Sequence, residues 1–191
     1  MPTPIHQLQA EHRIIEKALH ALQGLSNRLE QGERIDPAAF QRLFEFLTIF
    51  ADQRHHHKEE KCLFPALGRQ GLPRDHGPIG MMLQEHCTGR ALISHMKRAA
   101  GGYVNGDPNA SRHFSEAAAD YVHLLSEHIA KEDNMLFRIA ESVLDGQAMQ
   151  SLQNDFDQAE ADLPGSRAKY AHEAEELELA WAISERTTTC R

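Results

Sequence analysis

Apolar side chains recur every three to four residues along four long stretches of the chain, and turns rich in glycine and proline separate these stretches. This spacing places the apolar side chains on one face of a helix, and no convincing period-2 strand pattern is present. The first two stretches each have an N-capping residue, Thr3 or Asp36, directly before an opening proline. The predicted helices run from Pro4 to near Gly32, Pro37 to Pro65, Pro78 to Gly102, and Pro108 to Asp145.

Four long helices joined by short loops predict an all-α fold, an up-down-up-down four-helix bundle. The residues that follow Asp145-Gly146 are polar and acidic, and one or two further helices are expected there, in the stretch of residues 168–184. We therefore divide the chain into a bundle, residues 1–146, and a C-terminal helical appendage, residues 147–191. The clearest stripe lies on the fourth helix, where the predicted inward positions are Phe114, Ala118, Tyr121, Leu125, His128, Glu132, Met135 and Ile139.

The two halves of the predicted bundle repeat one another. Residues 55–64 and 128–137 share the pattern His-x-x-Lys-Glu-acid-x-x-Leu-Phe at an offset of 73 positions, and His12 and His86 lie 74 positions apart. So many matched positions at nearly one offset indicate two helical hairpins related by a pseudo-twofold axis.

Histidine and glutamate occupy seam positions where a packed bundle would carry leucine or isoleucine. A carboxylate buried there without a partner costs several kcal/mol, so it must be paired, neutralised or bound to a metal. At 1.5 Å per residue, His12 and His55 both lie ~30 Å from the turn between their helices, which puts them at the same height. The same count holds for His86 and His128, so the four helices bring four histidines to one layer.

On the second and fourth helices, His55 with Glu59 and His128 with Glu132 share a face at i and i+4. His56, three residues before Glu59, is also compatible with the same site. Imidazole and carboxylate ligands suit iron, manganese or zinc, and two glutamates able to bridge favour two ions over one. Hydrogen-bonded core histidines or a His–Glu network without metal are the simpler alternatives, but neither accounts for so many polar groups at one level in a repeat.

Composition excludes several classes of function. The formal net charge of -8 in 191 residues argues against a nucleic-acid partner, because phosphate contacts need a basic surface. No apolar run approaches the ~20 residues of a membrane span, and the N-terminus does not resemble a signal peptide. Three scattered cysteines favour a reducing cytoplasm. Cys62 and Cys87 are predicted to be packed or surface thiols and not metal ligands.

Together these motifs resemble the hemerythrin-like (HHE cation-binding) family over roughly residues 5–144. The resemblance rests on Glu11-His12-Arg13, the run from His55 to Pro65, Gly77-Pro78 with Glu85-His86, and the run from His128 to Asp133. It implies a four-helix bundle around a non-haem di-iron site. The implied ligands are His12, His55, His86 and His128, with Glu59 and Glu132 as bridging carboxylates.

The resemblance is incomplete at the third helix. Oxygen-carrying members place two histidines there, four residues apart, whereas the position four before His86 is Met82. His56, His76 from the preceding loop, or water would take the place of the missing ligand.

The histidine triplet also leaves two registers open, His55 with Glu59 or His56 with Glu60. One residue rotates an α-helical side chain by about 100°, so both registers cannot face one site equally. We prefer His55 with Glu59 because it matches the repeat, and we keep His56 as an additional ligand. The other histidines have no such alignment and are expected to be ordinary: His6, His20, His57, His95, His113, His123 and His172.

The resemblance implies two iron ions as the cofactor, with zinc or manganese as weaker alternatives. The implied partner is a small diatomic ligand such as O₂ or NO, or peroxide, bound for sensing, storage or stress protection. A di-iron peroxidase, a catalase-like or iron-oxidising enzyme, and an iron-responsive regulatory protein are the alternative functions, so enzymatic turnover stays open. The C-terminal segment is the candidate surface for a homodimer.

Overall fold

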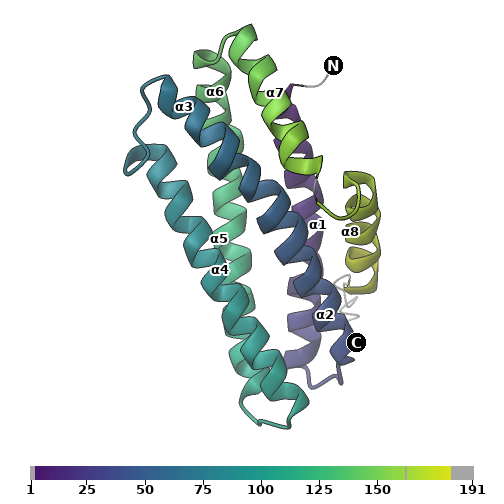
Figure 1. Ribbon diagram of the computed structural model, residues 1–191. Helices are drawn as coiled ribbons and strands as arrows, with labels where there is room; N and C mark the ends of the chain where they lie inside the picture. The colour runs from purple at the N-terminus through teal and green to yellow at the C-terminus, as the bar shows by residue number, and fades with distance from the viewer. Residues whose placement is uncertain (1–2, 162, 182–191) are drawn as a thin grey trace, which may run out of the picture.

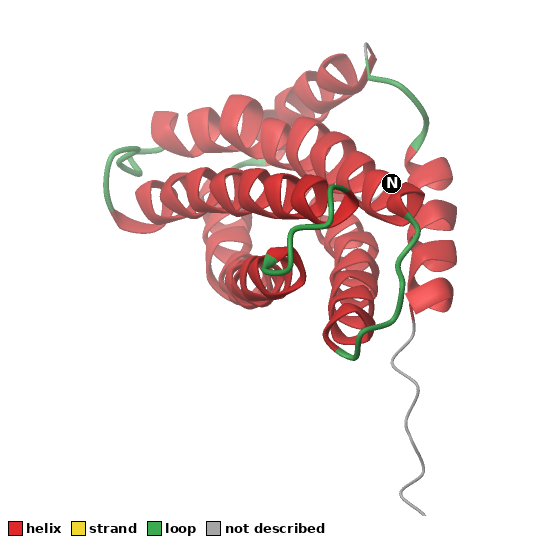
Figure 2. Ribbon diagram, turned by 90° about the horizontal axis from the view of Figure 1, so that it is seen from below, coloured by secondary structure: helices red, strands yellow, loops and turns green. Residues whose placement is uncertain are grey.

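The computed structural model describes residues 3–161 and 163–181, and none of these residues forms a β-strand. Figure 2 shows that the described secondary structure is helical throughout. Long helices stand side by side as a bundle, and shorter C-terminal helices cover its flank and one end (Figure 1). The uninterrupted long helices are α1 (Pro4–Glu30) and α4 (Gly77–Val104).

The other two long segments are α-helices interrupted by π-helical turns. The second consists of α2 (Pro37–Phe46), the π-helical segments η1 (Leu47–His56) and η2 (Glu59–Leu63), and α3 (Phe64–Arg69). The fourth consists of α5 (Ala110–Lys131), the π-helical segment η3 (Glu132–Leu136), and α6 (Phe137–Val143). The predicted helices are therefore present, but two of them do not keep the regular α-helical period.

Local signals set the helix starts as predicted. The Thr3 hydroxyl accepts a hydrogen bond from the backbone N–H of His6 at 3.2 Å, and Asp36 accepts one from Ala38 at 2.9 Å. Each side chain satisfies a backbone donor that has no partner within its helix. Gly32, just beyond α1, has a φ of 79°, which a residue with a side chain rarely adopts.

The predicted stripe on the fourth helix is wrong beyond Glu132. Met135 and Ile139 are only half-buried, whereas Leu136 and Ala140 are buried in their place. The reason is the π-helical turn, in which the backbone N–H of Phe137 donates to the Glu132 carbonyl five residues earlier. The turn inserts one residue, so the inward face moves forward by one position.

Two apolar cores fill the bundle. One contains Leu22, Phe50 and Phe114, and the other contains Leu8 and Phe64. The polar seam residues lie along the chain between the members of these two cores. The site is therefore a polar layer with an apolar core on each side.

The C-terminal helices belong to different cores. Phe156 of α7 (Gly146–Ala161) packs in the core that contains Leu8, and Tyr170 of α8 (Arg167–Trp181) packs in the other. Helix α8 lies along α1, where the absence of a side chain at Gly24 lets the Trp181 backbone approach (Figure 1).

The predicted C-terminal stretch of residues 168–184 lies within the described structure up to residue 181, and residues 182–184 lie outside the described residues. The division at residue 146 stays a prediction. Within the described ranges, no helix is long and apolar enough to cross a membrane.

Candidate metal centre

The seven side chains marked by the sequence gather in two adjoining groups inside the bundle. In each group the four potential ligand atoms lie within 4.8 Å of one another. Glu59 belongs to both groups, and all seven residues are buried. Cluster A consists of His12, His55, Glu59 and Glu132, and cluster B consists of His56, Glu59, His86 and His128.

The π-helical turns place the ligand-bearing residues of the second segment. His55 and His56 are both buried, one in each cluster. The preferred residue His55 and the additional one, His56, thus both face the interior, but they belong to different clusters, and Glu60 belongs to neither. A π-helix has more residues per turn than an α-helix, and such turns occur frequently at functional sites. An i→i+5 hydrogen bond follows each of the two glutamates, from Phe64 N–H to the Glu59 carbonyl and from Phe137 N–H to the Glu132 carbonyl.

Each glutamate faces one imidazole from each cluster. The two oxygens of Glu59 lie 3.5 Å from Nε2 of His55 and 3.5 Å from Nε2 of His86. Oε2 of Glu132 lies 3.2 Å from Nε2 of His12 and 3.3 Å from Nε2 of His128. The clusters are therefore connected by two carboxylates in equivalent positions of the repeat.

Several buried polar atoms of the two clusters have no hydrogen-bond partner. They are both ring nitrogens of His56, both carboxylate oxygens of Glu59, and Oε1 of Glu132. A buried carboxylate oxygen without a partner is costly, and a bound cation would remove that cost. The donor set of imidazole and carboxylate, with unpaired atoms directed at one another, fits a metal site.

Four further carboxylates hold the outer nitrogens of the histidines. Nδ1 of His12 lies 2.8 Å from Asp133, and Nδ1 of His86 lies 2.8 Å from Glu60. When Nδ1–H donates to a carboxylate, the lone pair of Nε2 points into the cluster, as metal-binding histidines require. The remaining pairs are His55 with Glu11 at 3.0 Å and His128 with Glu85 at 2.9 Å.

Glu11 and Glu85 were not predicted to have these roles. They directly precede His12 and His86 and lie 74 positions apart, so the internal repeat could have identified them. Each contacts a histidine on a neighbouring helix and also accepts a hydrogen bond from a lysine, Lys58 or Lys131.

These contacts change the pKa values of the site. Burial alone would lower the pKa of His12 and His86, but hydrogen bonds to their neighbouring carboxylates outweigh it and raise the pKa values to about 10 and about 9. Burial and the charge of His86 lower the pKa of His56 well below its usual range, which keeps that imidazole neutral. Burial would raise the pKa of Glu59, but the imidazoles of His55 and His86 hold it well below normal.

The fifth histidine breaks the symmetry of the repeat. His56 stacks on His86 with the ring centroids 4.0 Å apart, and the position 73 residues later is the buried Ile129. Cluster B therefore contains three imidazoles and cluster A two. Of the candidates for the extra ligand, His56 lies in the site, whereas the side chain of His76 is 73% exposed and pairs with Asp75.

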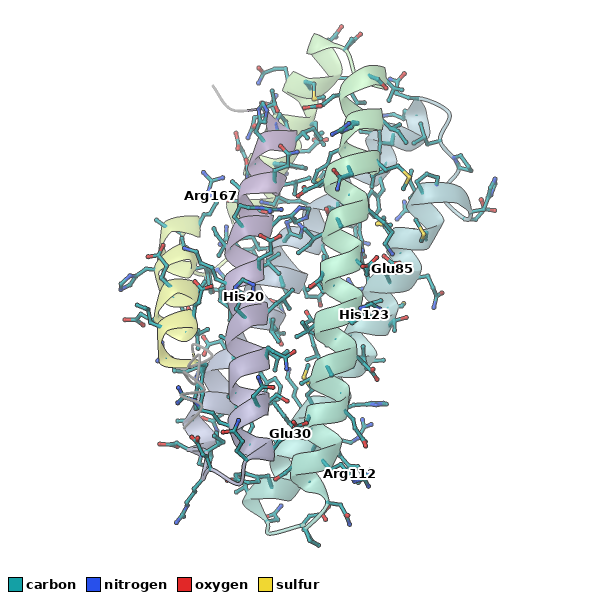
Figure 3. The ribbon with its side chains drawn as sticks, turned by 180° about the vertical axis from the view of Figure 1, so that it is seen from behind. His20, Glu30, Glu85, Arg112, His123 and Arg167 are labelled. Atoms are coloured by element: carbon teal, nitrogen blue, oxygen red, sulfur yellow. The ribbon has the colours of Figure 1, made fainter. Side chains whose placement is uncertain are left out.

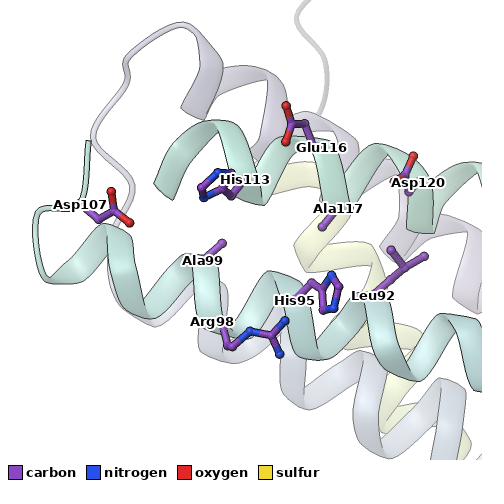
Figure 4. A pocket seen from close by; sticks show the side chains of 9 residues that line it. All are labelled: Leu92, His95, Arg98, Ala99, Asp107, His113, Glu116, Ala117 and Asp120. Carbon is purple, nitrogen blue, oxygen red and sulfur yellow. The ribbon is translucent and has the colours of Figure 1, made fainter. Parts of the chain in front are cut away.

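The other histidines of the described chain are all exposed. His20 and His123 lie on the outer faces of α1 and α5 (Figure 3). His95 and His113 line a surface pocket of about 480 Å³ between α4 and α5 (Figure 4). Neither Cys62, which is buried, nor Cys87, which is exposed, belongs to either cluster, and Cys190 lies outside the described residues.

Comparison with known proteins agrees with this geometry. Two relatives, an uncharacterized protein of Mycobacterium tuberculosis and one of Mycobacterium bovis, are each 22% identical to the chain over 158 residues. The match covers 83% of this chain and 61% of each relative, so the chain spans about six-tenths of their length. The family model of the hemerythrin HHE cation-binding domain matches residues 3–140, which contain both clusters. The chain belongs to the hemerythrin HHE cation-binding domain family.

Proposed function

We propose that this chain is a non-haem di-iron protein that binds a small ligand such as O₂, NO or peroxide, in the frame of an up-down-up-down four-helix bundle. The observation that carries the proposal is the pair of clusters sharing Glu59, with ligand atoms left unpaired in the protein interior. Two cations, one in each cluster, would satisfy those atoms.

The proposed ligands divide between the two ions. His12 and His55 would hold one ion, and His56, His86 and His128 the other, with Glu59 and Glu132 between them. Nitrogen and carboxylate oxygen donors without a thiolate suit iron better than a structural zinc site, which usually contains cysteine.

The burial of the site favours a small ligand. Cluster A has one imidazole fewer than cluster B, so we assign the ligand to cluster A. An iron pair supplies an open coordination position and electrons to such a ligand when bound. Phe137 stacks on His12 at 5.3 Å between ring centroids, and Phe64 stacks on His86 at 6.0 Å. These rings and the two apolar cores exclude water, while the outer carboxylates keep the imidazoles oriented.

The physiological role that we propose is sensing, storage or stress protection in the cytoplasm. A peroxidase, a catalase-like or iron-oxidising enzyme would turn over its substrate, whereas a binding protein would hold its ligand reversibly. Repeated cycles of adding and removing the ligand under anaerobic conditions distinguish the two, since only an enzyme leaves product.

Metal analysis of anaerobically purified protein, followed by visible spectra on adding O₂ or NO, tests the proposal. We expect two irons per chain and a ligand-to-metal absorption band. His128→Ala should lose iron, and His57→Ala, which alters an exposed histidine of the same triplet, should retain it. Stoichiometric zinc with no colour under any condition, or full iron content in His128→Ala, would overturn the proposal.

A further inference from the structure

Glu160 lies in the last turn of α7, outside residues 3–140 that match the family, and its carboxylate contacts side chains next to the metal clusters. Its carboxylate accepts hydrogen bonds from Lys58 and from Nε2 of Gln7 at 2.9 Å, and pairs with Arg54 at 3.0 Å. Lys58 and Arg54 flank the histidine triplet on both sides in sequence. The Glu160 carboxylate of the C-terminal segment therefore pairs with two positively charged side chains, Lys58 and Arg54. Both belong to the helical segment that also carries His55, His56 and Glu59.

Lys58 connects Glu160 to cluster A. Its side chain is fully buried, its Nζ donates to both Glu160 and Glu11, and it lies 5.5 Å from the ring centroid of Phe156. Glu11 in turn faces Nδ1 of His55 at 3.0 Å. A continuous series of polar contacts therefore runs from α7 to a side chain of cluster A.

Arg54, which pairs with Glu160, also binds the loop that connects α7 to α8. Its side chain is only 2% exposed, and it donates to the backbone carbonyls of Gly165 at 2.6 Å and Pro164 at 3.3 Å. The cost of burying this guanidinium is offset only while these acceptors remain in position. The end of α7 is thus docked against η1 by more than one side chain.

Among the residues that the structure describes, no carboxylate covers the equivalent series of the other half as Glu160 covers Lys58. Lys131 donates to Glu85, and Glu85 faces Nδ1 of His128 at 2.9 Å. The side chains of Lys131 and Glu85 are 31% and 15% exposed, and Figure 3 shows Glu85 on α4 beside α5. The repeat therefore supplies the same three groups twice, but α7 covers only one set.

We propose that Glu160 is a positioning residue of the metal centre. Acting through Lys58, it holds Glu11 against His55 and so slows the loss of the ion from cluster A. This inference rests on the proposed function, because it assumes that cluster A holds a cation. It assigns to the C-terminal segment a part in metal retention that residues 3–140 alone do not provide.

Release of Fe(II) to a chelator, measured anaerobically on the full chain, tests this inference. In Glu160→Gln we expect one of the two ions to leave about tenfold faster and the other to keep its wild-type rate, the smaller end of the effect typical for such outer contacts. Glu160→Asp keeps the charge and should lie closer to the wild type. Glu175→Gln removes an acid of α8 that pairs with Lys17 at the surface, and should change neither rate.

Two further variants separate positioning from loosening of the fold. In His55→Ala, where cluster A lacks a ligand, Glu160→Gln should not change release of the remaining ion. In a Lys58→Met background, Glu160→Gln should add nothing, because the effect passes through Lys58. Helical content and the unfolding midpoint are followed in every variant.

Faster release of both ions to the same extent would show a general structural role and overturn the inference, as would a wild-type release rate in Glu160→Gln. Either result leaves the proposed function standing. A wild-type chain that takes up no iron at all would contradict the proposed function itself and the inference with it.

Discussion

The two halves of the repeat carry the same lysine–carboxylate–imidazole series in different surroundings. In one half, Lys58 and Glu11 are fully buried, and in the other, Lys131 and Glu85 are partly exposed. The difference comes from α7, whose Glu160 adds a second carboxylate to Lys58. An internal repeat therefore duplicates the contacts of a site, whereas residues outside the repeat decide how well each copy is shielded from water.

The clusters also differ in composition. His56 gives cluster B a third imidazole, and Ile129 occupies the equivalent sequence position in the other half. Both differences can be tested by changing one half and leaving the other intact.

The largest effect is expected from the shared carboxylate. Glu59 belongs to both clusters, whereas Glu132 belongs to cluster A alone under the same distance criterion. We expect Glu59→Gln to lose more iron than Glu132→Gln, because the two oxygens of Glu59 face different clusters, whereas Glu132 faces His12 and His128 with a single oxygen. Iron per chain by elemental analysis measures this. Equal losses in the two variants would show that Glu132 serves both ions as Glu59 does.

Replacing Lys58 should lower the free energy of unfolding more than replacing Lys131, its counterpart in the other half. Lys58→Met leaves the buried Glu11 without its lysine partner, while Glu160 keeps Arg54, and breaking a buried pair such as Lys58–Glu11 costs about 3–5 kcal/mol. Lys131→Met removes a partly exposed partner, for which solvent screening limits the loss to about 1 kcal/mol or less. Urea unfolding of the metal-free proteins gives both values. Similar losses would mean that α7 does not shield Lys58.

Iron affinity should depend steeply on pH. In the metal-free protein the pKa of His12 is raised to about 10 and that of His86 to about 9, so both carry protons at neutral pH. Each ion displaces one of these protons, because His12 belongs to cluster A and His86 to cluster B, so the affinity for each ion should rise about tenfold per pH unit between about pH 6 and 8. Titration calorimetry in buffers of different ionisation enthalpy should report about two protons released. An affinity independent of pH would contradict these protonation states.

The same pKa shifts act with the opposite sign on the metal-free fold. A raised histidine pKa contributes stability that is complete below the unfolded value of about 6.5. That contribution is lost as the pH rises through about 9 and about 10, the values for His86 and His12. Metal-free protein should therefore lose this contribution at alkaline pH, where metal binding is strongest.

The smallest effect is expected from making the clusters alike. His56→Ile places in cluster B the residue type found at position 129, and should weaken retention of one ion about tenfold while leaving the other unchanged. Competition with a chelator measures this, and His57→Ala serves as the exposed neighbouring control. Unchanged retention of both ions would show that His56 is not a ligand.

Much of the helical structure followed from local patterns. Stripes of apolar residues predicted the long helices, and Thr3 and Asp36 predicted two of the starts, because both signals act over one or two turns. The π-helical turns were missed, since a single inserted residue leaves the neighbouring stripes intact and only shifts the face that follows. Met135 and Ile139 were misplaced for that reason.

The sequence by itself determined that the chain is helical, that its halves repeat, and that His12, His55, His86 and His128 occupy inward positions at one level with two glutamates. Helical period and spacing encode these properties locally. Only the tertiary structure decided that His55 and His56 lie in different clusters, which carboxylate contacts which imidazole, and that Glu160 covers one half. Such contacts join side chains far apart in the sequence, 121 positions for His12 and Asp133 and 153 for Gln7 and Glu160, and depend on how completed helices pack.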